Sequence, residues 1–195
     1  ITSTLDTVDG ALECMDDTED LREVMKVCVD RCYSMSRFIT NFANVVKIPE
    51  PQLQSVCLNE RVAACKMFME TVCRNRNITL HMTLCDENPR VNMDTSLFEQ
   101  VLVNIIKNAA ESIGGEGNIF IRTSVFPTML EIADTGAGIS KEVEAKLFSP
   151  FFSTKPNGQG IGLIFIREVL MKHGCTFSLR TYSDGLTRFR IRFNV

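Results

Sequence analysis

Apolar and thiol side chains that recur at alternating steps of four and three residues restrict the amino-terminal part of this chain to one kind of helix. They are Leu21, Met25, Cys28, Cys32, Met35, Ile39, Phe42 and Val46. A 3.5-residue repeat gives a helix an apolar seam that packs against other helices at a low crossing angle. Pro49 and Pro51 end the helix, because proline lacks a backbone donor and restricts its predecessor. The pattern predicts a helix over residues 18–47 in a bundle or coiled coil, and therefore a homodimer; an amphipathic helix packed on its own domain is the alternative.

The residues on either side of this helix predict two further parts. Residues 1–13 have Leu5, Val8 and Leu12 on one helical face, so they predict the end of another helix and thus a helical hairpin. Beyond the prolines, helical and alternating patterns are mixed. We therefore divide the chain into a hairpin at 1–48, a linker at 49–55 and a second domain at 56–195.

The second domain has the pattern of an α+β fold. Its apolar spacings predict helices over 59–76, from Asp94 onward, near 141–146 and over 161–172, and strands over 78–84, 118–126 and 128–134. A hairpin over 175–194, turned by Ser183-Asp184-Gly185, closes it. Strands joined by tight turns must be antiparallel, so we expect a two-layer α/β sandwich, a mixed sheet with helices on one face, preceded by the α-helical hairpin.

Composition excludes several function classes. The formal net charge of -3 gives no basic field for nucleic acid or an anionic membrane. No apolar run reaches the roughly 20 residues of a membrane span, so a membrane is expected only through segments missing from this chain, if at all. The eight cysteines are scattered and only two histidines are present, which fits the reducing cytoplasm and predicts no zinc site.

The predicted helix after Asp94 has one polar face. Asn104, Asn108 and Glu111 recur at steps of four and three, with Lys107 alongside, opposite an aliphatic stripe. Amide oxygens are hard, neutral ligands that suit Mg²⁺ when phosphates complete its coordination. Two asparagines alone are more often simply exposed polar residues.

Two glycine-rich segments follow. In EIADTGAGIS an apolar strand ends in Asp134, whose carboxylate can accept from an exocyclic amino group, while Gly136 and Gly138 allow close backbone approach. An aspartic protease would need a second such aspartate. In FSPFFSTKPNGQGIGL a loop leads into a helix, and backbone N–H groups at Gly158, Gly160 and Gly162 can face phosphate oxygens. The strand of a Rossmann turn and the Gly-Lys-Ser/Thr of a Walker motif are both missing.

In this order the three segments resemble the N, G1, F and G2 boxes of the GHKL superfamily, whose ATP-binding domain has the Bergerat fold. The resemblance covers residues 52–195. It implies that Asp134 binds adenine, with Thr187 assisting through a shared water, and that Asn104 and Asn108 hold Mg²⁺ on the phosphates, with Asn104 and Lys107 at the reacting end. It implies further ATP contacts from Gly136, Gly138, Ser153, Thr154, Lys155, Gly158, Gln159, Gly160, Ile161, Gly162 and Leu163.

Asn104 separates the members of that superfamily. Gyrase, MutL and heat-shock chaperone ATPases have a water-activating glutamate there, whereas NIIKNAAES looks like a histidine kinase, and the STK before the glycines is similar to the nitrogen-regulation type of sensor kinase. The hairpin resembles a dimerisation and phosphotransfer hairpin, whose histidine we expect upstream of Ile1. His81 and His173 are expected to be structural. The resemblance implies a protein-histidine kinase with a response-regulator partner.

Other functions stay open on the sequence alone. A GHKL ATPase or serine kinase shares the fold but not the acceptor, and a degenerate kinase would be a dimeric binding scaffold. The alternation RFRIRF at 188–193 could bind an anion. We instead expect Phe189, Ile191 and Phe193 to face the core, with arginines on the outer face.

Overall fold

The structure is a computed structural model that describes residues 19–46, 48–149, 152–154 and 160–194. The chain forms two compact units, residues 1–47 and 48–195. The described part of the first unit is one helix, α2 (Glu19–Val46), as the repeat predicts. The predicted helix over residues 1–13 lies outside the described residues, so the hairpin stays a prediction. In the described part of the chain, no helix is both long enough and apolar enough to cross a membrane.

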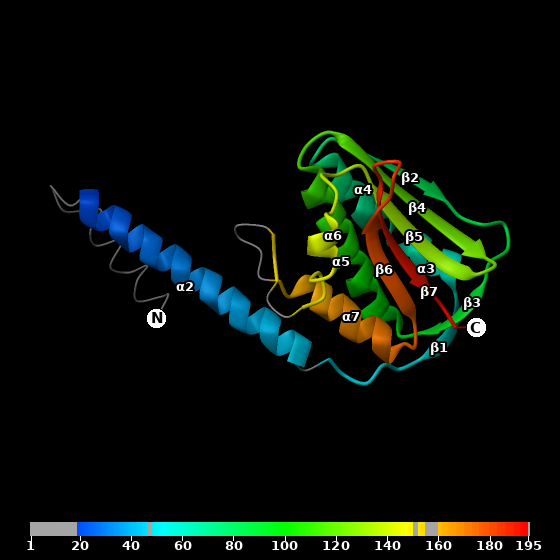
Figure 1. Ribbon diagram of the computed structural model, residues 1–195. Helices are drawn as coiled ribbons and strands as arrows, with labels where there is room; N and C mark the ends of the chain where they lie inside the picture. Colours follow the sequence, from blue (N-terminus) through cyan, green and yellow to red (C-terminus); the bar gives the residue numbers. More distant parts are fainter. Residues whose placement is uncertain (1–18, 47, 150–151, 155–159, 195) are drawn as a thin grey trace. The chain divides into compact units, whose positions relative to one another are not determined.

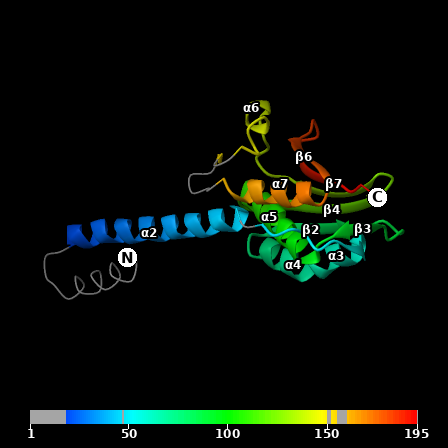
Figure 2. The same ribbon diagram turned by 90° about the horizontal axis from the view of Figure 1, so that it is seen from below.

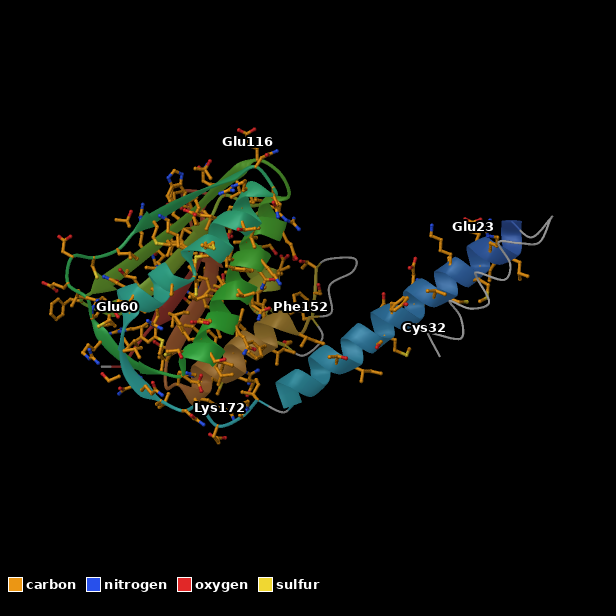
Figure 3. All side chains as sticks on the ribbon, turned by 180° about the vertical axis from the view of Figure 1, so that it is seen from behind. Glu23, Cys32, Glu60, Glu116, Phe152 and Lys172 are labelled. Carbon is orange, nitrogen blue, oxygen red and sulfur yellow. The ribbon has the colours of Figure 1, made fainter. Side chains whose placement is uncertain are left out.

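The seam of α2 is open to solvent. Three of its large side chains are more than half exposed, namely Leu21 at 52%, Met35 at 65% and Ile39 at 60%. Cys28 is also exposed, and Cys32 is partly covered; Figure 3 labels Cys32 on α2. An exposed stripe of this length is unfavourable in water unless another helix covers it.

The second unit is built on a mixed five-stranded sheet in the order β2-β4-β5-β7-β6 (Figure 1). The strands are β2 (Ile78–Thr83), β4 (Gly117–Val125), β5 (Thr128–Asp134), β6 (Thr176–Thr181) and β7 (Thr187–Arg192). Only β2 and β4 pair in parallel; tight turns join β4 to β5 and β6 to β7, and these pairs are antiparallel. The predicted fold class is confirmed.

Three helices form a layer against the sheet: α4 (Lys66–Arg74), α5 (Thr95–Ile113) and α7 (Gly162–Lys172) (Figure 2). The central helix, α5, contacts β4 and β5, while α4 contacts β2 and α7 contacts β6. The side chains beneath them are buried, among them Ile119, Ile121, Leu130, Ile132, Phe189 and Ile191. The short α6 (Lys141–Glu144) begins at Ser140, whose hydroxyl accepts from Val143 N–H.

The sequence was wrong on one helix. The predicted helix over 59–76 is two, α3 (Leu58–Ala64) and α4. At the break, the Cys65 N–H donates to Val62 O at 3.2 Å, a contact three residues back that tightens the turn. Leu58, Val62 and Met69 are buried on either side of the break, and no proline or glycine in residues 58–76 marks it.

A second, two-stranded sheet was not predicted. The antiparallel strands β1 (Gln54–Cys57) and β3 (Arg90–Met93) form it. The first residues of β1 fall in the segment predicted as a linker. Each strand has only four residues, too few for alternation to stand out from chance.

Hydrogen bonds at the start of α5 fix the segment by which the chain enters this unit. Asp94 caps α5 by accepting from Leu97 N–H at 3.1 Å, and its other oxygen accepts from Gln52 N–H at 3.0 Å. His173 Nε2 accepts from Asp94 N–H at 2.9 Å, while Nδ1 lies 2.7 Å from Val169 O. Both ring nitrogens are thereby engaged in the fold, which is the predicted structural role of His173.

The end of α7 binds the same segment. Lys172 Nζ donates to Ile48 O at 3.1 Å and pairs with Glu50 at 2.7 Å (Figure 3). His81 lies on β2, where Nε2 is 2.9 Å from Asn118 Oδ1 and the ring stacks on Phe120. These contacts support a structural role for His81 as well.

The outer face of β7 carries the arginines, as predicted. Glu131 pairs with Arg190 at 2.7 Å and with Arg188 at 3.7 Å. The Tyr182 ring lies against both guanidiniums, at 4.8 and 4.7 Å from its centroid. Phe189 and Ile191 point to the opposite, buried face.

Candidate functional site

The polar face of α5 supplies the first part of the site. Asn104 and Asn108 are half-buried, and Lys107 is exposed between them. The Asn104 amide donates from Nδ2 to Gln100 O at 2.9 Å. Its other polar atom, Oδ1, remains available as an acceptor. A Cβ added at Gly162 would lie 3.7 Å from that oxygen. The Asn104 acceptor therefore lies beside the start of α7.

Asp134 supplies the second part, at the end of β5. It is 6% exposed and accepts from Gly136 N–H at 2.9 Å. Burial raises the pKa of Asp134 to about 6, although the Gly136 hydrogen bond lowers it. Among the ion pairs of the described residues, none involves Asp134. A buried carboxylate of this kind fits a ligand that donates a hydrogen bond, such as an exocyclic amino group.

The turn after Asp134 requires its glycines. A Cβ on Gly136 would lie 2.3 Å from Ser112 Oγ and 2.8 Å from the Ser112 carbonyl carbon. Ala137 N–H donates to Ser112 O at 3.2 Å, so the turn is fixed directly on α5. Gly138 has a φ of 81°, in the region that favours glycine.

Two threonines continue the row that begins at Asp134. Asp134 is the register partner of Thr187, and Thr187 is the register partner of Thr181. Thr187 is 3% exposed, and its hydroxyl lies 2.9 Å from that of Thr181. Thr181 Oγ1 also accepts from Ile139 N–H at 2.7 Å.

The sequence singled out neither Thr181 nor Ser112. Pairing the predicted hairpin strands across the Ser183-Asp184-Gly185 turn would have set Thr181 opposite Thr187. Nothing local distinguishes Ser112, whose role comes from the packing of the glycine turn on α5.

The segment before α7 is described in part. Ser153 and Thr154 are exposed, Gly160 has a φ of 64°, and Ile161 is buried at the start of the helix. Gly162 and Leu163 are half-buried. Lys155, Gly158 and Gln159 lie outside the described residues. Their nucleotide contacts stay predictions.

Phe148 anchors the near end of that segment. Its ring meets Phe177 edge to face at 5.2 Å, and its carbonyl accepts from Arg167 of α7 at 3.2 Å. These contacts give Phe148 a packing role in the domain. Phe152 is half-buried, and Phe151 lies outside the described residues.

Helix α5 joins the two ends of the site. Asn104 lies beside the start of α7 and Ser112 beside the glycine turn. Eight residues of helix separate them, which corresponds to roughly 12 Å. The arrangement offers amide oxygens at one end and a buried carboxylate at the other, and so fits an elongated ligand with a phosphate chain and an aminated base.

Comparison with known proteins identifies the class. Residues 93–195 match the family described as histidine kinase-, DNA gyrase B-, and HSP90-like ATPases, and the chain belongs to this family of ATP-binding domains. The resemblance to sensor histidine kinases is confirmed by individual relatives. Sensor histidine kinase ZraS of Salmonella typhimurium is 27% identical over 168 residues, which are 85% of this chain and 36% of ZraS. AtoS of Escherichia coli is 30% identical over 155 residues, 78% of this chain and 26% of AtoS.

Solved structures of histidine kinases are also similar to this chain. The catalytic domain of histidine kinase ThkA has a TM-score of 0.66 and 28% identity, with 73% of this chain and 95% of that domain covered. Histidine kinase AdeS of Acinetobacter baumannii covers 98% of this chain with a TM-score of 0.68, but at 19% identity it shows the fold alone. The chain spans only about a third of the length of relatives such as ZraS.

The glycine turn provides a matched pair of variants. We expect Gly136→Ala to force the turn away from Ser112, to lower the free energy of unfolding by about 1–3 kcal/mol and to weaken nucleotide binding. Gly115→Ala is the control, since nothing lies within 4 Å of a Cβ there. Chemical denaturation of both variants tests this, and equal stabilities would contradict it.

The buried carboxylate predicts a pH dependence of stability. Because the pKa of Asp134 is raised to about 6 on folding, its protonation favours the folded state. Its contribution to the free energy of unfolding is therefore greatest below about pH 4 and declines as the pH rises from about 4 to about 6. We expect Asp134→Asn, which keeps an acceptor for Gly136 N–H, to be more stable than the native chain at pH 8 by up to about 3 kcal/mol.

Thermal unfolding of both proteins without nucleotide, at pH 4 and pH 8, measures this difference. The gain should disappear at pH 4, where the native carboxyl is protonated. Asp86→Asn, at an exposed position, is the control. A native chain that is no less stable than Asp134→Asn at pH 8 would show that the carboxylate is not strained by burial.

Proposed function

We propose that this chain is the ATP-binding catalytic region of a two-component sensor histidine kinase that transfers the γ-phosphoryl group of ATP to a histidine. One observation carries the proposal above all. At the reacting end of α5, the side chain is the Asn104 amide, with its oxygen directed to the start of α7. By resemblance, the ATPases of this family have a water-activating glutamate there. An amide cannot act as that base, so ATP is retained for transfer to a protein side chain.

The geometry around Asp134 supports adenine binding at this end of the site. Its carboxylate would accept from the exocyclic amino group, and Thr187 would assist through a water shared with the base. The amino group would supply a second donor to the buried carboxylate, beside Gly136 N–H. Gly136 and Gly138 bring the backbone close to the ring.

The phosphate end would be held by Asn108 and Asn104 through Mg²⁺. Amide oxygens suit this ion, and Mg²⁺ bound there would neutralise phosphate charge. Lys107 would add positive charge from its exposed position on α5. Ser153, Thr154 and residues 160–163 would contact the phosphates from the other side. The catalytic task is then mainly positioning.

The acceptor histidine and later partners belong to the whole protein. We propose that the histidine lies upstream of Ile1, on the first helix of a hairpin of which residues 1–48 are a part. The linker at 49–55 joins this hairpin to the catalytic domain. A solved complex, 23% identical to this chain, contains histidine kinase ThkA with the response regulator protein TrrA. The aspartate of a response-regulator receiver domain would be the next acceptor here. Cytoplasmic ATP and seven free cysteines among the described residues support a cytoplasmic location.

A homodimer would form through the seam of α2. Leu21, Met35 and Ile39 are exposed and lie on one helical face at the spacing of a helix bundle. A second copy of the chain offers the same seam, so a two-fold dimer buries both at once.

Calorimetric titration with a non-hydrolysable ATP analogue and Mg²⁺ tests the proposed function. We expect the native chain to bind, Asp134→Ala to lose at least about tenfold in affinity because the base loses a charged acceptor, and Asn108→Ala to lose the dependence on Mg²⁺. Asp86→Ala, exposed and away from the site, is the control.

Phosphate release separates kinase from ATPase. The native chain with Mg·ATP should release phosphate only slowly, and a longer chain that includes the upstream histidine should form acid-labile, base-stable phosphohistidine. Steady hydrolysis by the native chain would favour an ATPase. No nucleotide binding by the folded native chain would overturn the kinase proposal and favour a dimeric scaffold.

The dimer is tested by single glutamates on α2. We expect Met35→Glu, on the seam, to convert the chain to a monomer in light scattering, because a charge would be buried between helices. Val27→Glu is the matched control, since Val27 is 54% exposed but lies off the seam. Equal dimerisation by both variants would show that the seam is not the interface.

A further inference from the structure

The segment by which the chain enters the second unit is bound to that unit. We propose that Asp94 and Lys172 are positioning residues for phosphoryl transfer, because they hold residues 48–52 as a strap on the ATP-binding domain. The strap includes the first part of the predicted linker at 49–55. The inference rests on the proposed function, since it concerns how this domain reaches a histidine in another part of the protein. Neither residue belongs to the candidate site.

Lys172, the last residue of α7, holds the start of the strap. Its ammonium group donates to Ile48 O at 3.1 Å and pairs with Glu50 at 2.7 Å. An ammonium group has three N–H donors, so one side chain makes both contacts. The Glu50 side chain is 89% exposed. An ion pair this open to water is weak by itself, so the strap depends on its other contacts as well.

Asp94 holds the end of the strap. Its Oδ2 accepts from Gln52 N–H at 3.0 Å, while its Oδ1 caps α5 by accepting from Leu97 N–H at 3.1 Å. A backbone N–H can only donate, so each of these bonds has one possible direction. The pKa of Asp94 is lowered from its ordinary value, and the bond from Gln52 is the largest cause. The ionised carboxylate therefore favours the bound strap.

The end of α7 also fixes the backbone of Asp94. Asp94 N–H donates to His173 Nε2 at 2.9 Å. Because Nε2 accepts there, Nδ1 carries the ring proton and donates to Val169 O at 2.7 Å. The strap is therefore attached where α5 begins and α7 ends. The same two helices supply Asn104 and Gly162 at the phosphate end of the candidate site.

The attachment shortens the chain that connects bound ATP to the acceptor histidine. Release of residues 48–52 would add up to roughly 17 Å of extended chain to this tether. The effective concentration of two tethered groups falls as a flexible tether grows beyond the distance that it must span. We therefore expect release of the strap to slow phosphoryl transfer without weakening nucleotide binding.

Two variants release the strap in different ways. Asp94→Asn keeps an oxygen that caps α5, but its amide nitrogen cannot accept from Gln52 N–H. Lys172→Met removes the donors at the other end, and Lys172→Arg, which restores them, should behave like the native chain. Lys66→Met is the matched control, because Lys66 forms an exposed ion pair with Glu70 on α4, away from the strap.

Hydrogen exchange of the Gln52 amide, in the full chain without nucleotide, measures the strap directly. We expect exchange to become about tenfold faster in Asp94→Asn and about threefold faster in Lys172→Met, and to change less than about twofold in Lys172→Arg and Lys66→Met. Equal exchange in the native chain and both release variants would overturn the inference. If Asp94→Asn fails to fold, Lys172→Met decides.

The rate of phosphohistidine formation at saturating ATP, in a longer chain that includes the upstream histidine, tests the positioning role. We expect Asp94→Asn and Lys172→Met to lower this rate about threefold or more, with nucleotide affinity within about twofold of the native value. An unchanged or faster rate would overturn the inference, as would a loss explained by affinity alone. No nucleotide binding by the native chain would instead overturn the proposed function, and the positioning role with it, whatever the exchange result.

Discussion

A carboxylate is held almost out of water at the end of β5, where Asp134 is 6% exposed and its pKa is raised to about 6. Ionising a group in such surroundings costs free energy that the fold has to supply elsewhere. Contacts from neighbouring elements offset part of this cost. Gly136 N–H donates to the carboxylate, and the turn that carries this donor is fixed on α5 through Ser112. A ligand that donates a hydrogen bond to Asp134 lowers this cost. The ionised carboxylate is therefore least favourable when no such ligand is bound.

The two faces of helix α5 have different roles. One face stabilises the fold, and the other carries residues of the candidate site. Its apolar face, with Leu102, Ile106 and Ala110 nearly or fully buried, packs on the sheet and fixes the helix in place. Its other face carries Asn104 at one end and Ser112 toward the other. Since the helix is rigid and anchored by the core, packing fixes the positions of Asn104 and Ser112 relative to each other.

Particular residues show how far sequence reasoning reaches. Asn104, Asn108, Asp134 and the glycines could be predicted as site residues because they stand in short motifs whose chemistry is local. Thr181 could not, because its partners Ile139 and Thr187 meet it only through strand pairing and the glycine turn. The break at Cys65 was also missed, because no proline or glycine marks it in the sequence. The short β1 and β3 were missed because four-residue strands leave little pattern to detect.

The sequence by itself determined the class of fold and the apolar repeat of α2, and it predicted which residues form the site, since apolar periodicity, prolines and glycines act through backbone geometry that is local to each segment. Tertiary structure alone decided how the site is tuned. It buried Asp134 and so raised its pKa, it set Asn104 Oδ1 beside Gly162, and it aligned Asp134, Thr187 and Thr181 in one row. These properties depend on which distant segments come to lie together. The packing of β5, β6, β7, α5 and α7 supplies that information, and no single stretch of the chain contains it.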